Sequence, residues 1–224
     1  MAAQDDFDVR LDNLFQNDEE SSFIQQSYYY DLDEFNDVIN VHNNDSNLSI
    51  LNINARSLVK HFNEFSAILA DFPSLLDIIT VEETWLSEPL EPLVQMNGYS
   101  FISKHKNKCK EGGGIGIYVK NEIDYNKRDD LSCPKEYEDL FDYMFIEVKQ
   151  KAPLKNILVG VFYRPPGGDT VNILTDHLKV LLPKITNENK TIVLTSDMNI
   201  NLLQCSNHKP SSFYYDSAYT YAWL

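Results

Sequence analysis

The sequence predicts an α/β fold in which strands and helices alternate within one domain that starts near residue 47. Short runs rich in Val, Ile and Leu that end in polar residues recur between residues 48 and 199, as buried strands do. Two longer segments between them place apolar residues at helical spacing. With 224 residues, of which 43% are hydrophobic, the chain can bury a core of its own.

The elements are expected in the order β-α-β-β-β-β-α-β. The first helix is predicted over residues 57–72, with Ser57 as its N-cap. Its apolar face would be formed by Leu58, Phe62, Phe65 and Leu69. The second helix is predicted over about residues 170–182 and should end before Pro183, because proline interrupts helical hydrogen bonds. The strands are predicted at residues 48–54, 75–85, 112–120, 142–150, 156–166 and 191–199.

Residues 1–46 form an acidic leader, which we expect to be a disordered, solvated tail. They hold twelve acidic residues against Arg10 alone, which leaves about −4 of the total charge of −15 for the remaining domain. Such a body lacks the broad basic surface that strong non-specific DNA binding requires. The most concentrated basic stretch, "KHKNKCK" at residues 104–110, is either a contact for a DNA backbone or an ordinary solvated loop.

The cysteines and the hydropathy limit the cellular compartments in which the protein is expected. Cys109, Cys133 and Cys205 are far apart and form no CxxC pair, so we expect free thiols in a reducing compartment and no zinc site. No run approaches the roughly eighteen apolar residues of a membrane span, and the amino terminus is acidic, unlike that of a signal peptide. We therefore expect an intracellular protein, nuclear or cytoplasmic.

Polar residues stand at the ends of four of the predicted strands, where a sheet does not need them. They are Asn52 and Asn54, Glu82 and Glu83, Tyr163 and Arg164, and Asp197 and Asn199. Because side chains alternate along a strand, only one of the two glutamates is expected to face a shared site. Carboxylates and amides without His or Cys suit Mg²⁺ or Mn²⁺, which in turn suggests a phosphate-bearing substrate.

Five segments in this order carry a family resemblance: "LNIN", "DIITVEETWL", "GGGIGIYVK", "VGVFYRPPGG" and "SDMNINLL". Together they span roughly residues 48–203 and resemble the endonuclease domain of non-LTR (LINE-type) retrotransposons, in the endonuclease/exonuclease/phosphatase superfamily. The resemblance implies a DNase I-like two-sheet α/β sandwich, truncated at its C-terminus so that the second half is largely missing. It also implies DNA as the partner and Mg²⁺ or Mn²⁺ as the cofactor.

Matched one residue at a time, the resemblance implies roles at the strand ends. Asn52 would lie at the active site, and Glu83 would bind the divalent metal. Tyr163 would contact the scissile phosphate. Asp197 would position the nucleophilic water, and Asn199 would hydrogen-bond the nucleophile or the phosphate. Glu82, at a position that is usually Thr or Gln in the family, is expected to point away.

The sequence also departs from the family pattern. Ser196 and Met198 replace the Gly and Phe that usually flank the aspartate, and Asn54 replaces an acidic residue of some relatives. A later Ser-Asp-His element has no counterpart, since His208 lies in "NHKPSS". A domain truncated in this way would expose one face of a sheet, and we expect residues 211–224 to be poorly ordered.

The complete form is therefore interpreted as a divalent-metal-dependent endonuclease that nicks DNA by hydrolysing a phosphodiester. The alternatives are a catalytically dead remnant or binding module, and a phosphatase of the same superfamily.

Individual residues also have simpler interpretations. Asp197 and Asn199 would then form a turn or helix cap, and Arg164 would lie on the surface instead of clamping a phosphate. Residues 112–114, all glycine, are expected to form a hairpin and not a phosphate cradle. We also expect His177 to lie on a helix surface.

Overall fold

The computed structural model describes residues 48–70, 76–105, 112–167 and 170–201. Several sequence expectations fall on the rest of the chain and lie outside the described residues. These are the acidic leader at 1–46, most of the basic stretch at 104–110, Cys109, Cys205, His208 and the segment 211–224.

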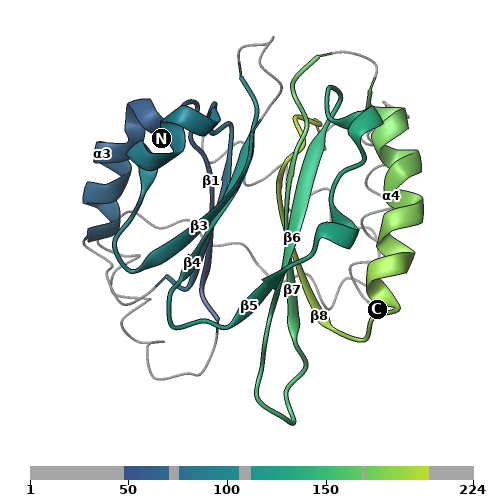
Figure 1. Ribbon diagram of the computed structural model, residues 1–224. Coiled ribbons are helices and arrows are strands. Elements are labelled where there is room, and N and C mark those ends of the chain that lie inside the picture. The colour runs from purple at the N-terminus through teal and green to yellow at the C-terminus, as the bar shows by residue number, and fades with distance from the viewer. Residues whose placement is uncertain (1–47, 71–75, 106–111, 168–169, 202–224) are drawn as a thin grey trace, which may run out of the picture. The chain divides into compact units, whose positions relative to one another are not determined.

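Two four-stranded mixed sheets pack face to face (Figure 1). The first sheet has the strand order β1 (Ile50–Asn54), β2 (Ile78–Glu82), β4 (Ile115–Lys120) and β3 (Tyr99–Lys104). The second has the order β5 (Tyr125–Lys127), β6 (Asp142–Val148), β7 (Ile157–Tyr163) and β8 (Thr191–Asp197). In each sheet the pair at one edge is parallel, β1 with β2 and β7 with β8, while the other neighbours are antiparallel.

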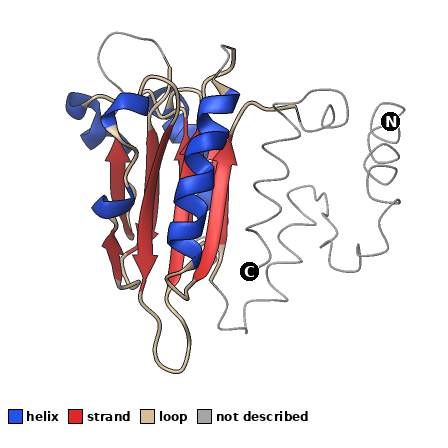
Figure 2. Ribbon diagram, turned by 90° about the vertical axis from the view of Figure 1, so that its right-hand side faces the viewer, coloured by secondary structure: helices blue, strands red, loops and turns tan. Residues whose placement is uncertain are grey.

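A helix covers the outer face of each sheet. α3 (Leu58–Ala70) packs Leu58 and Leu69 on the first sheet, and α4 (Val171–Thr186) runs along the second (Figure 2). Short 3₁₀ helices are η2 (Glu88–Val94), η3 (Asp129–Leu131) and η4 (Lys135–Tyr137). None of the helices in the described segments is long and apolar enough to cross a membrane.

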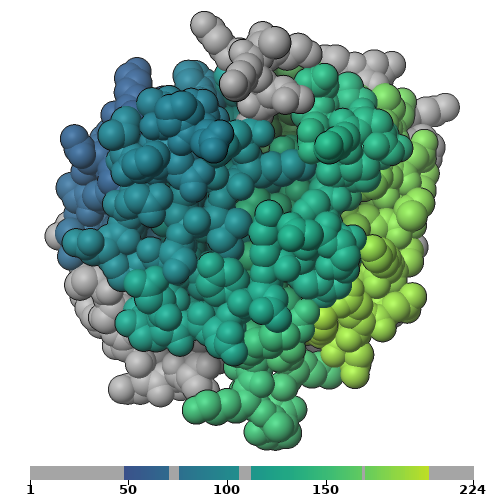
Figure 3. Space-filling model, in the orientation of Figure 1, coloured from purple at the N-terminus to yellow at the C-terminus, as the bar shows by residue number. Residues whose placement is uncertain are grey.

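The core between the sheets is built from the strand residues that point inward. Ile78 and Ile117 from the first sheet meet Ile146 and Val159 from the second, all of them buried, and side chains fill this space on the face shown in Figure 3. Burying one such side chain stabilises the fold by about 1.5–3 kcal/mol. This packing holds the strand ends of the two sheets in a fixed relation.

The eight predicted elements occur in the predicted order, and the six expected strands correspond to β1, β2, β4, β6, β7 and β8, but the described residues contain two more strands. β3 and β5 were not predicted. β3 is an edge strand whose residues are all only half-buried, and β5 has three residues, so neither has a strong apolar signal.

Two further expectations were wrong. α4 does not end before Pro183 but continues to Thr186, because Ile185 beyond the proline is fully buried against the second sheet. An uncovered sheet face was expected, yet each sheet packs on the other with its inner face and on a helix with its outer face.

Candidate active site

The polar residues at the ends of β1, β2, β7 and β8 meet at one rim of the sandwich. The side-chain Nδ2 of Asn54 donates to Glu83 Oε1 at 2.9 Å and to Asp197 Oδ2 at 2.6 Å. From the second sheet, the Tyr163 hydroxyl donates to the same Glu83 oxygen at 3.2 Å. The structure therefore brings Asn54, Glu83, Tyr163 and Asp197 together across the two sheets.

Asn52 lies on the same strand face as Asn54, two residues earlier in β1. Its Oδ1 accepts a hydrogen bond from the Thr80 hydroxyl at 2.7 Å. Asn52 and Asn54 are exposed, whereas Glu83 and Asp197 are half-buried. The rim is therefore open to a substrate at its amides and partly screened at its carboxylates.

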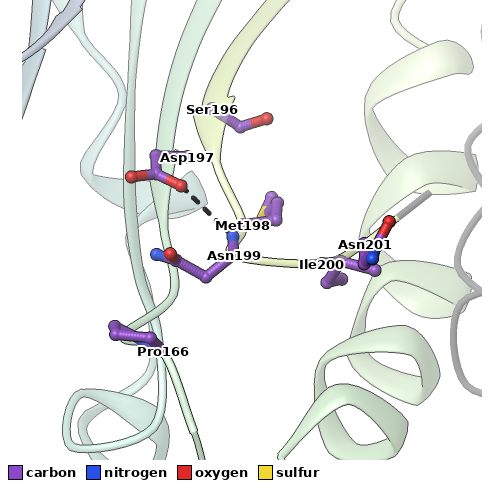
Figure 4. Close-up of a pocket in the computed structure, with 7 residues that line it drawn as sticks. All are labelled: Pro166, Ser196, Asp197, Met198, Asn199, Ile200 and Asn201. Atoms are coloured by element: carbon purple, nitrogen blue, oxygen red, sulfur yellow. Dashed lines mark hydrogen bonds between the residues drawn. The ribbon is translucent and has the colours of Figure 1, made fainter. Parts of the chain in front are cut away.

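Asn199 lies beside Asp197 but its amide is already engaged. Its backbone N–H donates to Asp197 Oδ1 at 3.2 Å, as Figure 4 shows, and its side-chain Nδ2 donates to the carbonyl of Arg164 at 2.9 Å. The φ angle of Asn199 is 49°, in the left-handed region that asparagine tolerates better than most residues. The resulting turn, with Pro166, lines a pocket of about 560 Å³ beside Asp197 (Figure 4).

The chain leaves β2 through a turn that redirects Glu83. Glu83 has a φ angle of 51°, and the N–H of the next residue, Thr84, donates to the carbonyl of Gly114 at 3.2 Å. Gly114 has a φ of 81°, and a Cβ there would lie 2.6 Å from the Thr84 hydroxyl, so a glycine is needed. The N–H of Trp85 likewise donates to the carbonyl of Gly113 at 2.9 Å, so the glycine segment holds the backbone of this turn, which agrees with a structural role for residues 112–114.

Glu82 also faces the site, contrary to the expectation that it points away. It is the last residue of β2 and has the same strand parity as Ile78, which lies in the core between the sheets. Strand alternation stops at Glu82, because Glu83 already has a left-handed backbone. Both glutamates can therefore approach one region.

The Glu82 carboxyl is fully buried at 0% exposure, and neither oxygen has a hydrogen-bond partner among the described residues. Burial raises its pKa to about 8. Hydrogen-bonding effects of the backbone N–H of Glu82 and of the Asn52 side-chain amide oppose this rise, and the negative charges of Asp197 and Glu83 add to it. Glu82 is thus a buried carboxyl group that is costly to ionise without a compensating positive charge.

Arg164 is not a surface residue, since only 3% of it is exposed. Its guanidinium donates to the carbonyls of Met198 at 2.7 Å and Asn199 at 2.7 Å. It also donates to the carbonyl of Gly167 at 3.2 Å and the hydroxyl of Thr170 at 3.1 Å. Arg164 therefore ties the turn after β8 to the loop after β7, and no pattern in the sequence distinguished this clamp from an exposed arginine.

Tyr163 is a hydrogen-bond donor held in its neutral form. Only 5% of the residue is exposed, and this burial, followed by the charge and hydrogen bond of Glu83, raises the pKa of the phenol above its usual value. The hydroxyl therefore stays protonated at neutral and mildly alkaline pH.

Two other residues differ from their expected settings. Lys104, the first residue of the basic stretch, forms ion pairs with Asp142 at 2.7 Å and Glu138 at 3.1 Å, which link β3 to the second sheet. His177 does not lie on a helix surface; its Nε2 is 2.7 Å from the Tyr143 hydroxyl, and its ring packs on Phe141. Both side chains therefore make specific contacts with other residues of the domain.

The donor set fits a partly hydrated divalent cation. No group of three or more His, Cys, Asp and Glu side chains converges closely enough to enclose an ion within the segments that the structure describes. Mg²⁺, however, usually keeps several waters and takes only one or two protein carboxylates. The shared contact of Asn54 with Glu83 and Asp197, together with the unpartnered oxygens of Glu82, supplies such hard donors.

Comparison with solved structures defines the class of fold. The two mixed sheets and their outer helices form the α/β sandwich of the DNase I-like fold, which the endonuclease/exonuclease/phosphatase superfamily shares. The fold expected from the sequence resemblance is therefore confirmed. No protein-family model matches the sequence, and a search of curated proteins finds no match.

Three of the similar structures illustrate the match. An AP endonuclease from Leishmania major, LMAP, has a TM-score of 0.57 and 13% identity over 77% of this chain and 66% of its own. The endonuclease domain of TRAS1, a telomere-specific non-LTR retrotransposon, has a TM-score of 0.55 and 9% identity over 78% of this chain and 70% of its own. A humanized D. rerio TDP2 has a TM-score of 0.51 and 15% identity over 71% of this chain and 65% of its own. At these identities the likeness establishes the fold alone.

Proposed function

We propose that residues 47–224 form a divalent-metal-dependent endonuclease domain of the retrotransposon type, which nicks DNA by hydrolysing a phosphodiester, with residues 1–46 as a separate acidic leader. The single observation that carries the proposal is the bridge from Asn54 to both Glu83 and Asp197, which joins the two acidic strand ends across the sheets. Exposed amides beside half-buried carboxylates suit a polar, anionic substrate.

The residues take complementary roles in this proposal. Glu83 holds Mg²⁺ or Mn²⁺, which when bound would neutralise charge that develops on the phosphate oxygens. Asp197 orients the attacking water and accepts its proton. Tyr163, neutral at working pH, donates a hydrogen bond to a phosphate oxygen.

The two remaining amides position the substrate. Asn52 presents its exposed side chain at the rim, next to Asn54. Asn199 sets the Asp197 carboxylate through its backbone N–H, and its side chain would have to leave the Arg164 carbonyl to reach a phosphate. Arg164 itself acts on the site only through the turn that it holds.

Plasmid nicking tests the proposal. We expect the full chain to convert supercoiled plasmid to the open circle in Mg²⁺ or Mn²⁺, and EDTA to stop the reaction. Asp197→Asn should slow it by about 10²–10⁴, and Glu83→Gln should do the same by weakening cation binding. Glu64→Gln, on an exposed carboxylate of α3, is the matched control and should nick normally.

The other outcomes separate the alternatives. An unmodified chain that leaves the plasmid intact but binds it would be a binding module. Metal-dependent release of phosphate from a small phosphomonoester, without nicking, would indicate a phosphatase. The distribution of the tagged chain between nucleus and cytoplasm would show whether the protein reaches a compartment where DNA is accessible.

A further inference from the structure

We infer that Glu82 is a second carboxylate ligand of the divalent cation, acting together with Glu83. The inference deepens the proposed function and rests on it for the location of the cation. It concerns a residue to which the sequence resemblance assigns no role in the site.

The first argument is the position of Glu82. In the parallel pair of β1 and β2, Glu82 is the direct register partner of Asn54. Asn54 in turn contacts both Glu83 and Asp197. Because Glu82 points to the inner face of the first sheet, as Ile78 does, its carboxylate lies on the side that faces the second sheet, close enough to Asp197 and Glu83 for their charges to act on it.

The second argument is that its oxygens have no partner. Buried polar groups in folded proteins nearly always make hydrogen bonds, and buried carboxylates are paired or coordinate metals. Glu82 is 0% exposed, and neither of its oxygens makes a hydrogen bond of acceptable geometry within the described residues; the Asn52 side-chain amide acts on the carboxylate from nearby without satisfying either oxygen. A fully buried carboxylate at the rim of the site, with neither oxygen in a hydrogen bond, has the chemistry of a cation ligand.

The third argument is the sign of the surrounding charge. The two charged groups that act on Glu82 most strongly are both acidic, Glu83 and Asp197. Arg164, directly after β7, is committed to the backbone carbonyls of Met198 and Asn199. A divalent cation would compensate this group of carboxylates, whereas a neutral ligand would not.

A competing explanation is that Glu82 is a neutral buried acid with a purely structural role beside Asn52. The two explanations differ for the isosteric change Glu82→Gln. If Glu82 is structural, Glu82→Gln should lower folding stability and leave cation affinity unchanged. If Glu82 is a ligand, Glu82→Gln should lower cation affinity. The metal-free variant should then be at least as stable as the unmodified chain, because an unpaired buried carboxylate has been removed.

The experiment measures Mn²⁺ binding alone, on the full chain, without DNA. The electron paramagnetic resonance signal of free aqueous Mn²⁺ falls as the ion binds, which gives the dissociation constant. We expect Glu82→Gln and Glu83→Gln each to raise this constant about tenfold or more. Glu64→Gln, which removes an exposed carboxylate from α3, should leave it unchanged. Urea unfolding in EDTA should show Glu82→Gln at least as stable as the unmodified chain.

A double variant tests the position directly. Asn54→Asp combined with Glu82→Gln moves the carboxylate across the register pair and should recover much of the Mn²⁺ affinity that Glu82→Gln loses. If Glu82→Gln fails to fold, Glu82→Asp replaces it; this variant keeps the charge but shortens its reach, and should also weaken binding.

The outcomes distinguish this inference from the proposed function. Normal Mn²⁺ affinity in Glu82→Gln, with loss in Glu83→Gln, overturns the inference and leaves the endonuclease proposal intact. No Mn²⁺ binding by the unmodified chain overturns both. Weakened binding in Glu82→Gln, in a chain that never nicks plasmid, supports the inference and rejects the endonuclease.

Discussion

The side-chain amide of Asn54, on the first sheet, lies 2.6 Å from a carboxylate oxygen of Asp197, on the second. The same nitrogen contacts Glu83 at 2.9 Å, so one amide bridges two acidic residues that are 114 positions apart in the chain (197 − 83), one directly after β2 and the other at the end of β8. This contact links the two sheets at the rim of the sandwich.

Asn54→Ala should make the stability of the chain depend more strongly on Mg²⁺. Without the amide, Glu83 and Asp197 lose a shared donor, and we expect the unfolding free energy to fall by about 1 kcal/mol in EDTA. Added Mg²⁺ should reverse most of this loss, because a cation that binds only the folded state stabilises it. Urea unfolding with and without Mg²⁺ measures the effect. An equal loss in both conditions would show that the amide does not act through the carboxylates.

Tyr163→Phe should retain the fold and lose activity. The change removes only the hydroxyl that donates to Glu83, so stability should fall by about 1 kcal/mol, whereas plasmid nicking should fall about a hundredfold. Tyr143→Phe is the matched control, because it removes a buried hydroxyl that contacts His177 on the α4 side of the same sheet. Equal nicking by the two variants would exclude a role for the Tyr163 hydroxyl in the reaction.

Arg164→Lys should damage both stability and activity, because lysine cannot reproduce the planar fork that reaches the carbonyls of Met198 and Asn199. We expect a loss of about 2–4 kcal/mol, measured by urea unfolding. Nicking should also fall at a temperature where the variant is fully folded, since the turn that Arg164 holds directly follows Asp197.

Arg56→Lys is the comparison for that variant, because Arg56 is exposed and its replacement should change stability by less than about 0.5 kcal/mol. A folded Arg164→Lys variant that nicks at the normal rate would show that the clamp supports the fold without setting the geometry of Asp197.

The sequence was informative where a buried apolar run ends in polar residues. That pattern located the ends of β1, β2, β7 and β8, because parallel and inward-facing strands must be apolar until they reach the rim. The contacts of Asn54, Glu83, Tyr163 and Asp197 agree with the convergence that this pattern suggested. Their catalytic roles stay predictions.

The details that sequence could not supply depend on tertiary contacts. The left-handed turn at Glu83 is held by carbonyls of the glycine segment before β4, about thirty residues away, so the expectation that only one of the two glutamates can face the site was wrong. Arg164 is buried because acceptors from the turn after β8 surround it, and nothing local in "YRPP" reports them. Both errors come from partners distant in the chain.

Acid should weaken the fold through Glu147, at the end of the second sheet that lies away from the site. Its carboxylate accepts from Lys190 Nζ at 2.6 Å, Asn156 Nδ2 at 2.7 Å and Arg128 Nη1 at 3.0 Å. Burial alone would raise its pKa, but the hydrogen bonds of Lys190 and Asn156 and the nearby positive charges outweigh burial and lower the pKa from 4.5 to about 2.

A carboxylate whose pKa is lower in the folded state contributes stability above its unfolded value, and this contribution is lost as the pH falls through the folded value. Glu147→Gln should therefore be less stable than the unmodified chain by about 2 kcal/mol at pH 7. The difference should shrink between pH 4.5 and about 2, where the unmodified chain loses the same charge. Urea unfolding across this range measures it, with Glu64→Gln as a variant that removes an exposed carboxylate. A constant difference down to pH 2 would mean that Glu147 stabilises the sheet through packing and not through its charge.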